Sequence, residues 1–203
     1  MEASAINLNR FMLSNCPQAE THIRLLRRSI EVSAALGSSS VIISLSLPQP
    51  PTIDRPPLRG ATLPRECFNE QARILRSAAR QASHCNVRIV LEMHDDGLLD
   101  TPQQCLRMLS AIDQPNVTIN PDLGNVVRTQ PPTCCWRESL RLLGPWTGYW
   151  HVKNYRNGAP VAIWEGDIDY VQAFRTMTNF NYDGWVSIES YFGGDILGLQ
   201  RQS

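Results

Sequence analysis

Apolar and polar residues follow two different periods along the chain, one typical of helices and one typical of buried strands. Within residues 18–36 apolar side chains recur every three to four positions, which predicts an amphipathic helix, and Gly37 is suited to end it. Short runs of β-branched and other apolar residues predict strands. The expected strands are 4–9, 41–47, 87–93, 117–122, 149–153 and 185–189, and the expected helices are 18–36, 65–84, 101–112, 138–143 and 167–179.

Strands and helices therefore alternate along the whole chain. Alternation of this kind is typical of right-handed βαβ units, so we expect an α/β protein with a parallel sheet. The segment 47–64 interrupts the pattern, because it holds six of the 14 prolines and cannot form regular structure. With 203 residues and no internal repeat, the chain has the size of one domain.

Composition excludes several classes of protein. The 19 basic residues balance the 19 acidic ones, which argues against a nucleic-acid-binding surface. No run of about 18 apolar residues predicts a membrane span, and the N-terminal sequence lacks the pattern of a signal peptide. The six cysteines form no CxxC pair and are typical of thiols in a reducing compartment. We therefore expect a cytoplasmic protein without nucleic-acid or membrane partners.

Side chains that can bind a metal occur where four successive strands are expected to end. Glu92 ends one strand, Asp122 ends the next, the following strand carries His151, and Glu189 ends the last. Ligands of parallel α/β sheets bind at the carboxyl ends of the strands. A single carboxylate there is usually only solvated, but three carboxylates and one imidazole suit Mn²⁺, Mg²⁺, Co²⁺ or Zn²⁺. The pattern favours a site for one divalent metal ion.

Five short segments lie at these strand ends or close to them. They are LEMH (91–94), NPDLGN (120–125), WHVKN (150–154), WEGDIDY (164–170) and YDGWVSIES (182–190). In this order and spacing they resemble the xylose isomerase-like TIM-barrel superfamily, and more narrowly its sugar phosphate isomerase/epimerase group. The resemblance covers about residues 20–195. It implies an incomplete (β/α)8 barrel that matches about the last six βα units.

The resemblance also implies a reaction. It makes Glu92, Asp122, His151 and Glu189 the ligands of one divalent metal, and it makes Glu92 and Glu189 the groups that remove and return a proton. A metal of this kind polarises a carbonyl and acidifies the neighbouring C–H bond. The expected function is that of a metal-dependent isomerase, epimerase or dehydratase acting on a sugar, a polyol or a small hydroxy-ketone.

Three further residues are candidates for binding the substrate. His94 lies on the same strand face as Glu92 by alternation, and a plain surface histidine is the alternative. Asn125 follows Asp122 by three residues, and the resemblance implies a contact with the substrate or with the metal ligands. Lys153 shares the strand face of His151, and a solvated strand end is its alternative.

The chain departs from the family pattern in two respects. A complete barrel needs eight βα units and about 250 residues. We therefore expect residues 1–203 to form a single domain that lacks the first two units, with an open edge that a homo-oligomer would cover. Relatives that epimerise keto-sugars carry a glutamate where this chain has Leu98 and an arginine where it has Asn157. Epimerisation of a free ketose is thus less favoured than another isomerisation or a dehydration.

Two other functions stay open at this point. The missing units are compatible with a catalytically inactive barrel remnant that binds a partner protein through its open edge. The apurinic endonuclease branch of the same superfamily is a minor alternative, because its metal cluster needs more histidines than the four of this chain.

Overall fold

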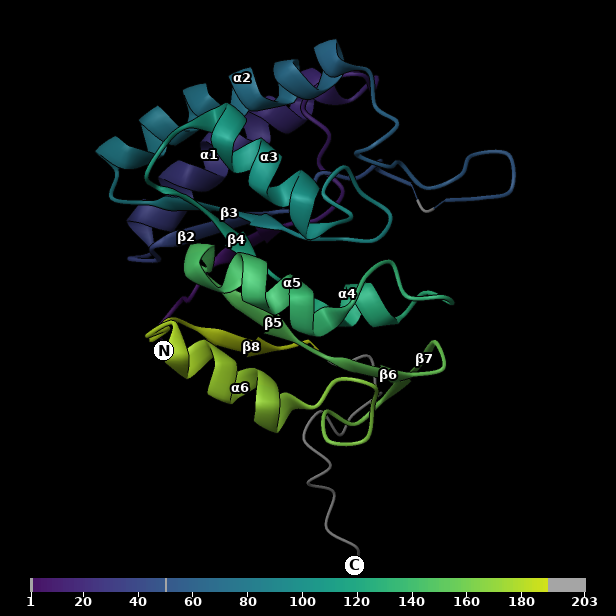
Figure 1. Cartoon of the computed structure of the whole chain (residues 1–203). Coiled ribbons are helices and arrows are strands. Elements are labelled where there is room, and N and C mark those ends of the chain that lie inside the picture. Colours follow the sequence, from purple (N-terminus) through teal and green to yellow (C-terminus); the bar gives the residue numbers. More distant parts are fainter. Residues whose placement is uncertain (1, 50, 190–203) are drawn as a thin grey trace, which may run out of the picture. The chain divides into compact units, whose positions relative to one another are not determined.

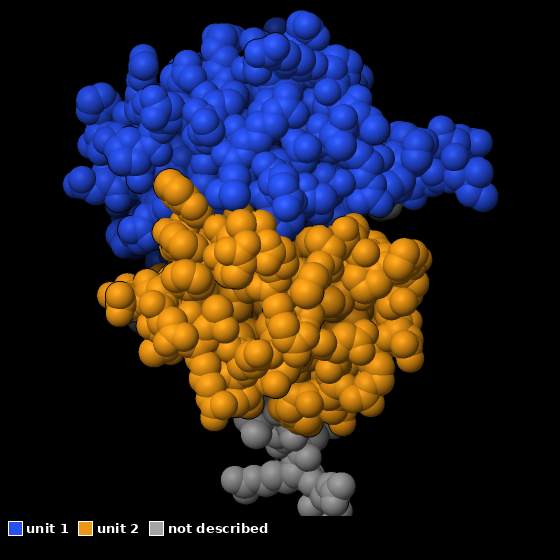
Figure 2. Space-filling view, viewed as in Figure 1, with its two compact units in different colours: residues 1–120 blue, residues 121–203 orange. Residues whose placement is uncertain are grey.

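The computed structural model describes residues 2–49 and 51–189, which divide into two compact units (Figure 1). Unit 1 comprises residues 1–120, and unit 2 comprises residues 121–203; Figure 2 shows them in different colours. The boundary falls between Asn120 and Pro121, just beyond the end of a strand.

Unit 1 is a parallel sheet with helical crossovers. Its elements are β1 (Ile6–Leu8), α1 (Ala19–Ala35), β2 (Ser40–Ile43), α2 (Arg65–His84), β3 (Arg88–Glu92), α3 (Pro102–Ile112) and β4 (Val117–Asn120). The four strands are adjacent in chain order and all parallel. The three helices cover one side of the sheet (Figure 1). This arrangement confirms the expected α/β class, and it places Glu92 opposite Asn120 in the register of β3 and β4.

Apolar periodicity explains the packing of unit 1. Leu26 and Ile30 on α1 and Phe68 and Leu75 on α2 are fully buried, as is Ile89 on β3. All four residues of β2 are buried. A buried parallel strand is expected to be mainly apolar, which fits residues 41–43, whereas Ser40 at the start of β2 is polar.

Local sequence signals set the helix ends. The Thr101 side chain accepts a hydrogen bond of 3.3 Å from the Gln104 N–H, so Thr101 is the N-cap of α3 and Pro102 its first residue. After α1, Gly37 has a φ of +69°, the left-handed conformation that ends many helices. Helix α2 spans Arg65–His84, the range that its periodicity predicts.

The proline-rich segment after β2 has no helix or strand among its described residues. Arg59 anchors it by donating hydrogen bonds to the Asp95 carbonyl (3.0 Å) and the Asp100 carboxylate (3.2 Å). The Gly60 N–H donates to the same Asp100 side chain, and a Cβ on Gly60 would lie 2.2 Å from the Leu98 carbonyl oxygen. The loop is therefore fastened to the turn that follows β3.

Unit 2 has shorter elements. They are α4 (Leu123–Val127), α5 (Trp136–Leu143), the 3-10 helix η1 (Gly144–Trp146), β5 (Trp150–Val152), β6 (Asn154–Arg156), β7 (Ala159–Val161), α6 (Tyr170–Asn179) and β8 (Val186–Ile188). Strands β5 and β8 pair in parallel, and β6 and β7 form an antiparallel hairpin. The fully buried Trp150 packs against the rings of Phe174 and Tyr170 from α6.

Some predicted boundaries were wrong. The strand expected over 117–122 ends at Asn120, because Asp122 caps α4 instead of continuing the strand. The strand expected over 41–47 ends at Ile43. The pattern also missed α4 and the β6–β7 hairpin, since elements of three to five residues are too short to show a period. In the described part of the chain no helix is long and apolar enough to cross a membrane.

The cap of α3 gives a test of this local structure. Replacing Thr101 by alanine should lower the free energy of unfolding by about 1 kcal/mol, because the Gln104 N–H loses its partner. Ser110 is exposed in the last turn of the same helix, so Ser110→Ala is the matched control and should leave stability unchanged or raise it by up to about 0.5 kcal/mol. Urea unfolding followed by circular dichroism measures both, and equal effects would contradict the capping role.

Candidate metal centre

Asp122 is held in place by its role at the start of α4. Its Oδ1 accepts a hydrogen bond of 3.3 Å from the Asn125 N–H, as an N-cap does. The side chain is fully buried. Its Oδ2 is buried as well and accepts no directed hydrogen bond from the described residues, although an ion pair reaches it. One carboxylate oxygen thus fixes the turn while the other is available to a cation.

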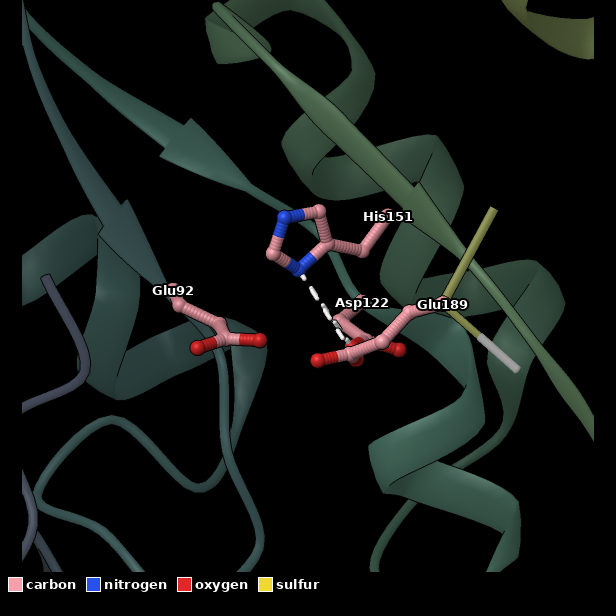
Figure 3. A group of neighbouring side chains, drawn as sticks. All are labelled: Glu92, Asp122, His151 and Glu189. Carbon is pink, nitrogen blue, oxygen red and sulfur yellow. Dashed lines mark ion pairs between the residues drawn. The ribbon is translucent and has the colours of Figure 1, made fainter. Parts of the chain in front are cut away.

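His151 and Glu189 come from the paired strands β5 and β8. His151 is the middle residue of β5, and Glu189 directly follows β8, where its N–H donates to the Val152 carbonyl (3.1 Å). The His151 Nδ1 lies 3.9 Å from Asp122 Oδ2 and 3.9 Å from Glu189 Oε2 (Figure 3). Three predicted metal ligands of unit 2 therefore converge, with one ligand atom of each within 4.8 Å of the others.

The spacing of these three groups fits a single divalent ion. Bonds of about 2.0–2.2 Å to imidazole and carboxylate place ligand atoms on opposite sides of an ion about 4.0–4.4 Å apart. The separation of 3.9 Å from the imidazole nitrogen to each carboxylate oxygen lies just below that limit. The mixture of oxygen and nitrogen donors suits Mg²⁺, Mn²⁺, Co²⁺ or Zn²⁺.

Lys153 brings a positive charge to the same carboxylates. Its Nζ lies 2.8 Å from Asp122 Oδ2 and also forms an ion pair with Glu189 Oε2. The lysine side chain is 4 % exposed. The prediction that Lys153 shares the face of His151 is consistent with this position, and its proposed contact with a substrate stays a prediction.

Lys153 is held in place by two residues, Tyr170 and Gly124, which were not among the candidates predicted from the sequence. The Tyr170 hydroxyl accepts a hydrogen bond from the Lys153 N–H (3.1 Å) and donates one to its carbonyl (2.8 Å). Burial, and next the negative charge of Asp122, raise the pKa of Tyr170. A Cβ on Gly124 would lie 2.2 Å from Lys153 Cγ, so only glycine leaves room for the lysine chain. Gly124 and Tyr170 stand in the NPDLGN and WEGDIDY segments, which is the signal that could have found them.

Two further candidates, Glu92 and His94, lie in unit 1. Glu92, the fourth predicted ligand and also drawn in Figure 3, is the last residue of β3 in unit 1. In the turn after β3, His94 Nδ1 lies 2.5 Å from Asp96 Oδ1, and Asp96 pairs with Arg10 at 2.8 Å. Burial alone would raise the pKa of Asp96, but hydrogen bonds and charges from His94 and Arg10 lower it below its usual value. The substrate contact of His94 stays a prediction.

Three other positions concern the predicted substrate and its class. Asn125 is buried on α4, and its backbone N–H donates to the Asp122 side chain that caps this helix. The predicted contact of Asn125 with a substrate stays a prediction. Leu98 is fully buried in unit 1. Asn157 is exposed in the β6–β7 turn with a φ of +51°. The two positions at which this chain departs from keto-sugar epimerases thus hold a core residue and a turn residue.

A family model described as a xylose isomerase-like TIM barrel matches residues 1–199. The chain belongs to this family. The match confirms the predicted superfamily and its TIM-barrel fold, and it runs through both compact units. The matched range includes β3, β4, β5 and β8, the strands at whose ends the candidate metal ligands were predicted.

Relatives of this xylose isomerase-like protein include enzymes with named reactions. A 3-dehydroshikimate dehydratase of Bacillus anthracis is 28% identical over 88 residues, which are 43% of this chain and only 30% of that enzyme. A xylose isomerase-like TIM barrel protein from Mycobacterium smegmatis in complex with magnesium superposes with a TM-score of 0.83 at 23% identity, covering 95% of this chain and 68% of that one.

Two further solved structures share the fold. The probable 3-DHS dehydratase AsbF from Bacillus anthracis superposes with a TM-score of 0.79 at 17% identity, covering 96% of this chain and 72% of that one. An L-ribulose 3-epimerase gives a TM-score of 0.74 at 20% identity, covering 95% and 63% of the two chains. Dehydratases and epimerases are therefore both found on the fold of this xylose isomerase-like chain.

The Tyr170 hydroxyl gives a test of how the centre is supported. Tyr170→Phe should lower the free energy of unfolding by about 1–3 kcal/mol at pH 7, because two buried backbone groups of Lys153 lose a partner. Tyr155→Phe is the control, since the structure records no hydrogen bond to the Tyr155 hydroxyl among the described residues.

Because the pKa of Tyr170 is raised, the unfolded chain loses this proton first as the pH rises. The advantage of the native tyrosine should therefore shrink above about pH 10, and an advantage that stays constant to pH 11 would contradict this.

Proposed function

We propose that this chain is a divalent-metal-dependent enzyme that isomerises, epimerises or dehydrates a sugar, a polyol or a small hydroxy-ketone. The observation that carries the proposal is the convergence of Asp122, His151 and Glu189, whose ligand atoms lie within 4.8 Å of one another. The family membership supports it, because isomerases, epimerases and dehydratases share this fold. The metal is Mg²⁺, Mn²⁺, Co²⁺ or Zn²⁺, and a relative of the same fold was crystallised with magnesium.

Glu92 is proposed as the fourth ligand. In a TIM barrel the carboxyl ends of all strands meet at one face, and Glu92 ends β3. It stands opposite Asn120 in the register of β3 and β4. Neighbouring strands are about 4.8 Å apart, and two residues of chain span at most about 7.2 Å. The covalent connection from Asn120 to Asp122 therefore keeps the Asp122 carboxylate within reach of a metal that Glu92 also binds.

The proposed reaction starts with the removal of a proton from a carbon next to a carbonyl. A bound divalent ion would polarise that carbonyl and the adjacent hydroxyl. Glu189 is suited to accept the proton, because its side chain is 32% exposed whereas that of Asp122 is fully buried. Glu92 would return the proton on the opposite face in an isomerisation or epimerisation. His94, Asn125 and Lys153 would hold the oxygen atoms of the substrate.

Dehydration of a hydroxy-ketone is the first reaction to test. One relative is a 3-dehydroshikimate dehydratase, and the keto-sugar epimerase residues are absent at Leu98 and Asn157. In such a reaction a carboxylate removes the proton next to the ketone, and the hydroxyl on the following carbon leaves as water after it is protonated. A second copy of the chain is proposed to cover open sheet edges, since among the described strands β1 and β4 each pair with a single neighbour in unit 1, as β5 and β8 do in unit 2.

Metal content and proton exchange test this proposal. The purified protein, reconstituted with Mn²⁺ or Zn²⁺, should hold about one ion per chain by mass spectrometry, as one ligand set predicts. In deuterated water it should exchange the acidic C–H protons of its substrate within a panel of 3-dehydroshikimate, ketoses and inososes. Replacing Glu189 by glutamine should lower the exchange rate by at least about 100-fold.

Glu138→Gln is the matched control for that variant. Glu138 is an exposed residue of α5 that pairs with Arg141 at 2.7 Å, so its loss should leave both the metal content and the exchange rate unchanged. A protein that retains no metal after reconstitution would refute the proposed function. Metal binding without exchange for any compound would instead favour the inactive, partner-binding alternative.

A further inference from the structure

Lys153 is the only lysine in the chain. Of the 19 basic residues the other eighteen are arginines, and the one lysine directly follows β5, two residues after His151. The cation is an arginine in the exposed ion pairs that the structure records, such as that of Arg141 with Glu138. The single exception to arginine therefore coincides with the candidate metal centre.

The ammonium group contacts the atoms that a metal would use. Nζ lies 2.8 Å from Asp122 Oδ2 and is ion-paired with Glu189 Oε2. These same two oxygens each lie 3.9 Å from His151 Nδ1, and their residues belong to the group of potential metal ligands. An ammonium is a compact point charge with three donors, whereas a guanidinium is a wide planar fork. Lysine is thus the cationic side chain closest in shape to an ion between two carboxylates.

The position of this ammonium is built into unit 2. Tyr170 holds both backbone polar groups of Lys153, and Gly124 leaves the space through which the lysine chain passes. The lysine side chain is 4% exposed, and its partner Asp122 is fully buried. A buried side chain with its backbone fixed and its path cleared by a glycine does not sample many positions.

We infer that Lys153 is the internal counter-cation of the metal centre, and that a divalent ion must displace its ammonium from Asp122 Oδ2 and Glu189 Oε2 in order to bind. The inference rests on the proposed metal-dependent function. Before metal binds, the ammonium offsets the repulsion between the two carboxylates. When metal binds, the positive charges of the ion and the ammonium repel each other, so both do not share the same two oxygens at short range. Lys153 therefore stabilises the metal-free protein and weakens the affinity for metal.

Replacing Lys153 by methionine tests the sign of this effect. Met keeps the length of the chain without its charge, so K153M should bind Mn²⁺ and Zn²⁺ at least tenfold more tightly by isothermal titration calorimetry. The metal-free variant should unfold at a lower temperature than the native protein, and saturating metal should raise its Tm by more than it raises that of the native protein. Arg141→Met removes the same charge from an exposed pair on α5 and should change the metal affinity less than twofold.

The outcomes separate this inference from the function on which it rests. Native protein that binds metal together with K153M that binds it equally or more weakly would overturn the inference and leave the proposed function intact. Absence of metal binding in both proteins would refute the proposed function and the inference with it. Tighter binding in K153M but not in R141M supports the inference.

A second measurement does not depend on the folding of a variant. Native protein grown with lysine labelled by ¹³C at Cε gives one lysine signal in an NMR spectrum, because the chain has one lysine. Titration with diamagnetic Zn²⁺ should move this signal in proportion to the bound metal, as the ammonium leaves the two carboxylates. A signal that stays in place while calorimetry shows metal binding would overturn the inference.

Discussion

The charge balance around Asp122 and Glu189 is the interaction on which the candidate centre depends. Two carboxylates held close together in a largely buried place are costly unless a cation lies between them. Here the fold fixes both carboxylates by unrelated means, one through the N-cap of α4 and the other through the pairing of β8 with β5. The Lys153 ammonium joins them, and His151 completes the set. The fold therefore places two carboxylates close together, and the cation between them offsets their repulsion.

Buried carboxylates are also paired with cationic side chains at the strand ends of unit 1. Arg10, Asp96 and His94 form a chain of ion pairs after β3, and Arg59 ties the proline-rich loop to Asp100. Burial raises the pKa of Asp100, although the Arg59 guanidinium opposes that shift. Loops at the carboxyl ends of these strands are thus fixed by buried polar contacts in addition to apolar packing, such as that of Leu98 and Leu99. Such contacts give the loops defined conformations, which a site for a small polar ligand requires.

Sequence reasoning reached the parts of the structure that depend on local signals. Helix α2 follows from its apolar period, the start of α3 follows from Thr101-Pro102, and Glu92 ends its strand as expected. The convergence of Asp122, His151 and Glu189 also follows, because parallel strands deliver their carboxyl ends to one edge. Tyr170 and Gly124 were missed although both stand in the NPDLGN and WEGDIDY segments, since their importance depends on the path of one lysine side chain, which the segments alone do not show.

A chain with eighteen arginines and one buried lysine has an unusual chemical surface. When folded, it presents no exposed lysine amine to acylating agents, so amine-directed chemistry at a side chain must wait until unit 2 opens around Lys153. The rate at which this amine is acylated therefore becomes a direct gauge of local opening near Tyr170 and Gly124. Any modification that removes the lysine charge would act on the protein as a single, well-defined lesion at the candidate metal centre.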